Sequence, residues 1–156
     1  MKKTNVMRLL DAEEISYKPI EYDKKDGFID GQSVAKKIGY PVENVFKTLV
    51  VKSKEDNLYV ALLPVGEELD LKKLSNLLGE KNIHMLPAKD LLKTTGYVHG
   101  GCSPLGMKKD LPTIIDSSVE NLDYLIFSGG KIGFQVKISI DELKKILAYN
   151  IGDIIK

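Results

Sequence analysis

The sequence has very little cysteine, no tryptophan and no long apolar run. Its only cysteine is Cys102, so no disulfide can form within the chain, and a reducing compartment is the simpler environment. No stretch approaches the roughly 20 apolar residues that a membrane-spanning helix needs. The N-terminal residues reach acidic side chains before any apolar core and so do not resemble a signal peptide. We therefore expect a cytoplasmic protein with no membrane partner.

Motifs for metals and for phosphate-bearing cofactors are also missing. One cysteine and two histidines, His84 and His99, form no recognisable metal-ligand spacing. The chain contains no phosphate-binding loop, no dinucleotide-binding fingerprint after a strand and no serine nucleophile elbow. We expect no metal and no cofactor.

What is present is the composition of a globular protein, with 43% hydrophobic and 29% charged residues among 156. This length suits a single domain over residues 1–156. The 23 basic and 22 acidic side chains leave a net charge of +1, which argues against a dedicated nucleic-acid binder. The lysines at 36–37 and 108–109, with Lys131 and Lys137, could still gather on one face, or they could be ordinary solvated side chains.

The hydrophobic pattern predicts an α+β fold. Helices are expected where apolar residues recur every three or four positions, and strands where they alternate or form short β-branched runs. Because strands outnumber helices without strict alternation, we expect a curved mixed β-sheet or barrel-like core flanked by helices. Pro19 indicates an edge strand or a bulge. The predicted helices are 3–14, 33–38, 71–78, 87–94 and one beginning at Ser139; the predicted strands are 15–22, 45–52, 58–65, 82–86, 97–99, 111–116, 123–127 and 132–138.

Lys47 is out of place in the predicted strand 45–52. Its same-face neighbours are apolar, and the opposite face carries Phe46, Thr48 and Val50. A cation at such a position must find a partner, line a cavity or extend its ammonium into water. The pattern alone leaves a functional lysine and a surface lysine equally open.

Two glycine-rich loops are candidates for ligand binding. The first, Gly100-Gly101-Cys102-Ser103-Pro104-Leu105-Gly106, is longer than a tight turn requires, and its glycines would let backbone amides approach a ligand. The second spans residues 128–133 and begins with Ser128-Gly129. Because two adjacent glycines suit a β-hairpin, we favour a simple turn for the second loop.

Cys102 and His99 also suggest a cysteine nucleophile, since a nearby histidine can lower the pKa of a thiol. A lone cysteine is more often a small buried apolar residue, so this interpretation is the weaker one.

Five separated segments, in order, resemble the YbaK/EbsC family. They are EYD at 21–23, VFKTLVV at 45–51, LPVGEELDLKKL at 63–74, TGYVHGGCSPLGMKKDLPTIID at 95–116 and SGGKIG at 128–133. This family comprises bacterial trans-editing deacylases related to the editing domain of prolyl-tRNA synthetases.

The resemblance implies an ester hydrolase that removes a wrongly attached small amino acid from the acceptor end of a tRNA. Lys47 matches the lysine that is characteristic of the family, and Gly101 matches the position whose backbone contacts the substrate carbonyl region. The implied substrate-binding positions are Tyr22, Thr48, Gly100, Cys102, Ser103, Pro104, Ser128 and Gly129.

The segment GGCSPLG looks more like the cysteine-removing branch of the family, which makes Cys-tRNA(Pro) the expected substrate. In that branch the substrate's own thiol attacks the ester, and the enzyme orients the substrate and stabilises charge. Gln135 stands where relatives carry an acidic residue, so no acid role is transferred to it. Prolyl-tRNA synthetase is an implied partner. Alternatives are a deacylase for Ala-tRNA(Pro) or another small aminoacyl-tRNA, and a non-catalytic module that binds the tRNA end or the synthetase.

Overall fold

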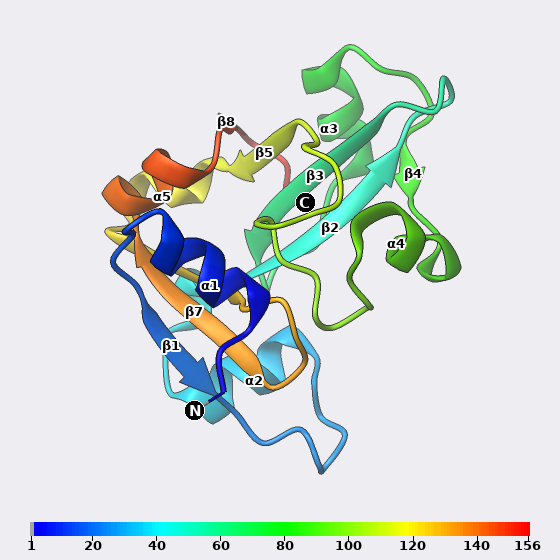
Figure 1. Ribbon diagram of the computed structural model, residues 1–156. Helices are drawn as coiled ribbons and strands as arrows, with labels where there is room; N and C mark the ends of the chain where they lie inside the picture. The colour runs from blue at the N-terminus through cyan, green and yellow to red at the C-terminus, as the bar shows by residue number, and fades with distance from the viewer. Residues whose placement is uncertain (1) are drawn as a thin grey trace.

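The computed structural model describes residues 2–156, which form two open β-sheets with helices packed around them (Figure 1). No helix within these residues is long and apolar enough to cross a membrane. The helices are α1 (Asn5–Ala12), α2 (Gly31–Ile38), α3 (Leu71–Leu78), α4 (Ala88–Thr95) and α5 (Ile140–Ile146), with short 3-10 helices η1 (Val42–Asn44) and η2 (Ser117–Asn121). The strands are β1 (Lys18–Glu21), β2 (Phe46–Lys52), β3 (Leu58–Pro64), β4 (His84–Met85), β5 (Thr113–Asp116), β6 (Tyr124–Ser128), β7 (Phe134–Ser139) and β8 (Asn150–Gly152).

Capping residues fix where the helices begin and end. The Asp70 side chain accepts a hydrogen bond from the Lys73 amide at the start of α3, and Gly79 ends that helix in the left-handed conformation. Ser139 caps α5 by accepting from the Glu142 amide, as the sequence predicts. Asp30 caps α2 in the same way and thereby places the start of that helix beside the cavity described below.

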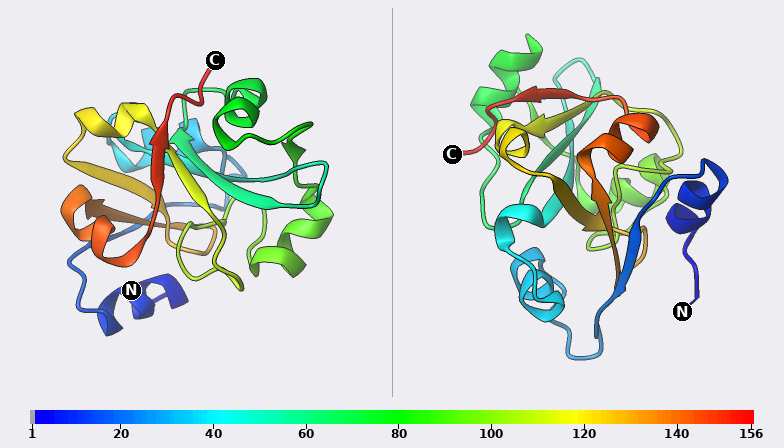
Figure 2. Two further views of the ribbon diagram at one scale, coloured as in Figure 1. Left: turned by 90° about the horizontal axis from the view of Figure 1, so that it is seen from above. Right: turned by 90° about the vertical axis from the view of Figure 1, so that its left-hand side faces the viewer.

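The first sheet has the strand order β1-β7-β6, and both pairs of strands are antiparallel. Helices α1 and α2 lie on opposite sides of it (Figure 2). Strand β1 is an edge strand and contains Pro19, as predicted, because a residue without an N–H is tolerated where no ladder partner is needed.

The second sheet is mixed, with the order β4-β2-β3-β5-β8. Strands β2 and β3 are antiparallel, whereas β3 pairs with β5 and β5 with β8 in parallel. Strand β4 pairs only with Val51 and Lys52 at the end of β2. The earlier part of β2 therefore has no β4 partner along that edge.

The main core lies between the two sheets and under α1. The apolar face of β7, with Val136 and Ile138, packs here together with Phe46 and Val50 of β2. A second cluster fills the other face of the mixed sheet under α3, and a third lies between α2 and the outer face of the first sheet. Strand β2 thus has apolar contacts on both faces, as its composition predicts.

The predicted α+β class and the mixed sheet are confirmed, with two open sheets in place of a closed barrel. The predicted strand 97–99 is wrong. Gly96 and Gly100 both adopt left-handed conformations, with φ of 87° and 88°, and turn the chain before it can join a neighbouring strand. Strand β8 was not predicted, because three residues give too short a pattern to recognise.

Candidate active site

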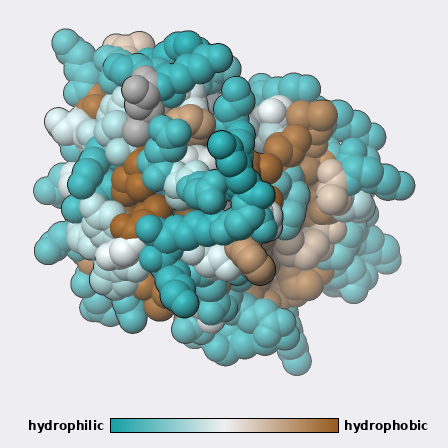
Figure 3. Space-filling view, turned by 90° about the horizontal axis from the view of Figure 1, so that it is seen from below, coloured by the Kyte–Doolittle hydropathy of each residue, from teal (hydrophilic) through white to brown (hydrophobic). Residues whose placement is uncertain are grey.

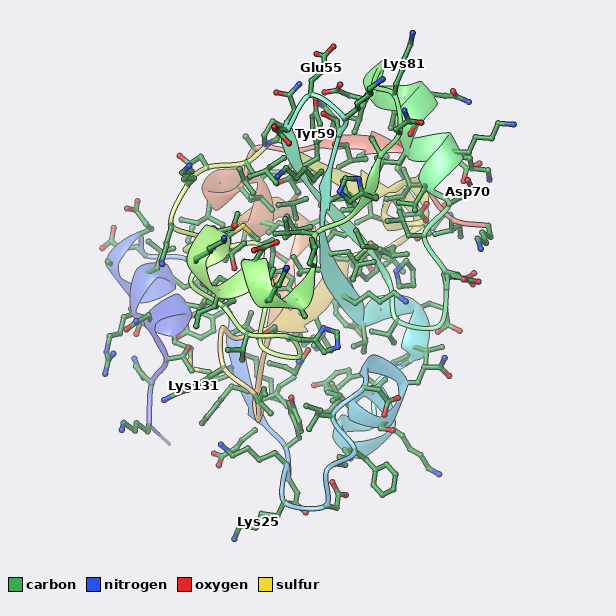
Figure 4. All side chains as sticks on the ribbon, turned by 90° about the vertical axis from the view of Figure 1, so that its right-hand side faces the viewer. Lys25, Glu55, Tyr59, Asp70, Lys81 and Lys131 are labelled. Carbon is green, nitrogen blue, oxygen red and sulfur yellow. The ribbon has the colours of Figure 1, made fainter. Side chains whose placement is uncertain are left out.

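A cavity of about 400 Å³ lies along the uncovered edge of β2. It is bounded by the start of α2, by α4 and by the turn at His99–Gly100, and its size is typical of small-ligand sites. Figure 4 shows α4 in front of β2, and both elements contribute residues to the lining of the cavity. Six of the expected site residues line it: Tyr22, Lys47, Thr48, Gly100, Cys102 and Ser128.

The backbone of Thr48 is directed toward this open edge. The Val50 carbonyl accepts a hydrogen bond from the Leu86 amide on the β4 side, at 2.9 Å, whereas the Val45 carbonyl accepts from Val65 on the β3 side. Because backbone polar groups alternate between the two edges of a strand, Thr48 faces the same way as Val50. Its N–H and C=O groups are therefore available at the cavity.

Lys47 is half-buried in the cavity wall. Burial lowers the pKa of its ammonium, and the negative charges of Glu68 and Glu67 counteract part of this effect by raising it. Lys47 is not part of any ion pair within residues 2–156. A desolvated ammonium without a paired carboxylate is well suited to bind a polar or anionic group of a ligand.

Three other residues that line the cavity each carry a polar side-chain atom with no hydrogen-bond partner within the described part of the chain. These atoms are the Tyr22 hydroxyl, the Thr48 Oγ1 and the Gln135 Oε1, and each is buried. Leaving a buried polar atom unpaired is costly, and such atoms are rare in folded proteins. All three atoms belong to residues that line one cavity, so a polar ligand in that cavity is a candidate partner for them.

Gln135 is the residue of this group to which the sequence assigned no role. It is 7% exposed, and its register places it opposite Ser128 on β6 and Ile20 on β1. The one sequence signal that could have indicated it is a glutamine placed between the apolar residues Phe134 and Val136 of β7.

The first glycine loop lies beside the cavity, but only part of it forms the wall. The Gly101 N–H, which we expected to be a free donor, donates to the Val98 carbonyl at 3.0 Å. A Cβ at Gly101 would lie 3.2 Å from the Ile132 nitrogen, so this glycine lets the loop pack against the second glycine loop. Contact of Gly101 with a substrate stays a prediction.

Three further expected binding residues lie outside the cavity lining. Ser103 is fully buried, and its Oγ accepts from the Leu105 amide at 3.3 Å. Pro104 is also buried. The Gly129 N–H donates to the Phe134 carbonyl at 2.9 Å in the connection between β6 and β7, which agrees with the predicted hairpin.

Tyr97 holds the two glycine loops together. Its hydroxyl donates to the Leu105 carbonyl in the first loop, and burial raises the pKa of that hydroxyl to about 12. Its ring packs on Gly130 of the second loop, where an added Cβ would lie 3.3 Å from the ring. Tyr97 is therefore a positioning residue for the wall of the cavity.

Cys102 and His99 both line the cavity, but no hydrogen bond joins them within residues 2–156. Burial raises the pKa of the Cys102 thiol to about 12, so it stays protonated at neutral pH. A protonated thiol is a poor nucleophile, and the geometry gives the cysteine-nucleophile interpretation no support.

Exposed apolar side chains lie near the cavity. Phe28, at 63% exposure, precedes the lining residue Ile29, and Val98 precedes His99. Met85 is 41% exposed and itself lines the cavity. Figure 3 shows apolar side chains reaching the surface between hydrophilic ones on the lower face. Within residues 2–156, no three histidine, cysteine or acidic side chains are grouped as metal ligands would be.

Comparison with known proteins identifies the family. Residues 30–146 match the model of the aminoacyl-tRNA editing domain. The chain belongs to this family. The chain is also 40% identical, over 138 residues, to a protein of Enterococcus faecalis named "Putative Cys-tRNA(Pro)/Cys-tRNA(Cys) deacylase EbsC"; the match covers 88% of this chain and 84% of that protein. The resemblance inferred from the five segments is confirmed.

One further relative and one solved structure are also similar to this chain. A proline–tRNA ligase of Trichlorobacter lovleyi is 32% identical over 115 residues, and the match covers 68% of this chain but only 20% of the ligase. A crystal structure of "a putative trans-editing enzyme for prolyl tRNA synthetase" has a TM-score of 0.86 at 20% identity and covers 100% of this chain and 99% of its own. At that identity, the structural match shows a shared fold.

Proposed function

We propose that this editing domain is a trans-editing hydrolase that deacylates mischarged tRNA, with Cys-tRNA(Pro) as its preferred substrate. The observation that carries the proposal is the cavity at the open edge of β2. It combines the desolvated ammonium of Lys47 with three buried polar atoms that lack partners. An aminoacyl ester of a ribose offers an ammonium, a carbonyl and hydroxyl groups that can satisfy such atoms. The name of the Enterococcus relative supports the choice of amino acid.

Lys47 orients the aminoacyl-adenosine end and stabilises the charge that develops on it. A preorganised cation in a partly desolvated site stabilises negative charge more strongly than the same cation in water. The Thr48 amide at the open edge of β2 is a second donor that could face the developing oxyanion, since the Gly101 amide is occupied by Val98. Lys47 forms no covalent bond with the substrate in this proposal.

The nucleophile comes from the substrate. The thiol of the esterified cysteine gives up its proton and its sulfur attacks its own ester carbonyl. The bond from the carbonyl carbon to the ribose oxygen breaks, the ribose oxygen takes up the proton, and the cysteine leaves as a cyclic thiolactone, which water then opens to free cysteine. The lining of the cavity agrees with this proposal, because its one thiol, Cys102, is held protonated by burial. Correct positioning of the two reacting groups can lower the barrier of an intramolecular attack without a protein nucleophile.

Synthetases discriminate poorly between small side chains of similar size, and a second pocket corrects this by hydrolysing the wrong products that the first pocket admits. The proposed partner is the acceptor end of a tRNA, held mainly through phosphate contacts, with prolyl-tRNA synthetase as a further partner. Because the net charge of the chain is only +1, we expect weak affinity for free tRNA that falls as salt increases.

The test compares the release of cysteine, alanine and serine from charged proline tRNA. The wild type, Lys47→Ala and the control Lys52→Ala are measured side by side. Lys52 lies on the same strand, forms an ion pair with Asp56 and does not line the cavity. We expect cysteine to be released fastest, Lys47→Ala to lose the activity, and Lys52→Ala to keep it.

The other outcomes assign other functions. Faster release of alanine than of cysteine would make this an alanine-removing deacylase. Binding of tRNA without release of any amino acid would indicate a non-catalytic module. Inactivation by Cys102→Ala would restore the cysteine-nucleophile interpretation and contradict attack by the substrate thiol.

A further inference from the structure

Lys18 and Lys137 lie directly opposite each other on strands β1 and β7. Like charges that face each other across two strands are destabilising unless an opposite charge lies between them. Neither lysine takes part in an ion pair within residues 2–156. We call these two residues the lysine pair. The first sheet therefore holds two neighbouring cations without a counter-ion from the protein.

Two tyrosines hold the lysine pair in place. The Lys137 ammonium lies 4.4 Å from the centre of the Tyr124 ring and 5.1 Å from that of Tyr40. The Lys18 ammonium donates to the Tyr40 hydroxyl at 3.3 Å. The two rings meet edge to face, with centres 6.2 Å apart. Cation–π contacts of this kind fix the ammonium groups without neutralising them.

The lysine pair and the cavity share one face of the first sheet. Lys137 lies two residues from the cavity residue Gln135 and points to the same side of β7, about 7 Å further along the strand. Helix α2 covers the space between them. Its start borders the cavity and its end leads to Tyr40, a length of about 12 Å for eight residues.

We propose that the lysine pair binds a backbone phosphate of the RNA whose aminoacylated end enters the cavity. This inference rests on the proposed function. The aminoacyl ester is on the last nucleotide of a single strand, so the preceding phosphates must leave the cavity across the neighbouring surface. A phosphate between Lys18 and Lys137 supplies the counter-ion that the protein lacks, and Tyr40 and Tyr124 preorganise its two donors.

The experiment uses the full chain with Lys18→Gln and Lys137→Gln combined. A matched control combines Lys54→Gln with Lys81→Gln. Those two exposed lysines also lie side by side, since the Lys54 amide donates to the Lys81 carbonyl. Figure 4 shows Lys81 at the far end of the molecule from α2. The dissociation constant for uncharged proline tRNA is measured for each protein over a range of salt concentrations.

We expect the lysine-pair variant to bind tRNA about tenfold more weakly at low salt, and the slope of log affinity against log salt to fall by about one. The control pair should change neither quantity. Replacing both lysines of the pair by arginine should retain the slope. Hydrolysis of a minimal aminoacyl-adenosine substrate, which ends before the lysine pair, should be unchanged.

Equal effects of the two double variants, or an unchanged salt slope, would overturn the inference. So would a loss of thermal stability in the lysine-pair variant without a change in slope, because the lysines would then act only in folding. Binding is measured with uncharged tRNA, so failure of the deacylase proposal is seen separately. If the wild type has no hydrolytic activity but the lysine-pair variant still lowers the salt slope, the phosphate site is supported and the deacylase proposal is refuted.

Discussion

Replacing Lys47 by methionine should stabilise the fold. Methionine keeps an unbranched side chain that can lie on the same strand face, and it removes the ammonium whose pKa is lowered by burial. A polar group buried without a partner costs roughly 1–3 kcal/mol, and the half-exposed position of Lys47 reduces this to about 1 kcal/mol. For a chain of this size, the melting temperature should rise by about 3 °C.

The gain should depend on pH in a defined direction. The pKa of Lys47 is lower in the folded state than its ordinary value of 10.5, so the unfolded chain binds more protons between those two values. The stability of the wild type therefore rises with pH in that window, because deprotonation removes the buried charge. The advantage of Lys47→Met should be greatest below the lowered folded pKa of Lys47 and should shrink as the pH rises to about 10.5.

Denaturant unfolding at pH 7 and at alkaline pH measures both effects. Lys52→Met is the control, because Lys52 is paired with the exposed Asp56 and should change the free energy of unfolding by less than about 0.5 kcal/mol. A loss of about 1 kcal/mol or more in Lys47→Met would refute the reasoning, since it would show that the ammonium makes a favourable contact in the folded state.

Three other substitutions test the walls of the cavity. Tyr97→Phe removes the hydrogen bond to the Leu105 carbonyl but keeps the ring, so kcat for deacylation should fall about tenfold with little change in KM; an unchanged kcat would remove its positioning role. Cys102→Ala should keep deacylation within roughly threefold, and alkylation of the wild-type thiol at pH 8 should be slow, because its pKa is raised to about 12. Gly130→Ala should lower the free energy of unfolding by about 1–3 kcal/mol, as its φ is 92° and the new Cβ would lie 2.6 Å from Val6; wild-type stability on denaturant unfolding would contradict this.

Local chemistry made much of the fold predictable. The strands β2 and β3 are long, apolar on both faces and rich in β-branched residues, so their pattern has few other interpretations. Helix α3 has both its Asp70 cap and its Gly79 end in the sequence. The apolar residues of segment 97–99 are typical of a strand. The left-handed conformations of Gly96 and Gly100 prevent one, and a sequence does not reveal which glycines adopt that conformation.

The candidate site was predictable only in part, because it depends on contacts between distant segments. Lys47 could be singled out from the sequence because it is a charged residue in a largely apolar stretch of strand, and Thr48 is the next residue on that strand. The sequence could not show that Gly101 donates its amide to Val98, since that depends on how the loop folds. Nor could it show that Gln135 is buried without a partner, because Tyr22, Thr48 and Gln135 come to line one cavity only when β1 pairs with β7 and both approach β2.

The most direct test of the central claim is the single-turnover rate at which cysteine is released from Cys-tRNA(Pro) by the wild type and by Lys47→Met. The account predicts rapid release by the wild type and a rate about 10²–10³ lower for the variant, because a charge-stabilising donor has been removed from a site that remains folded. No release by the wild type, or a folded Lys47→Met variant that releases cysteine at the wild-type rate, would contradict it.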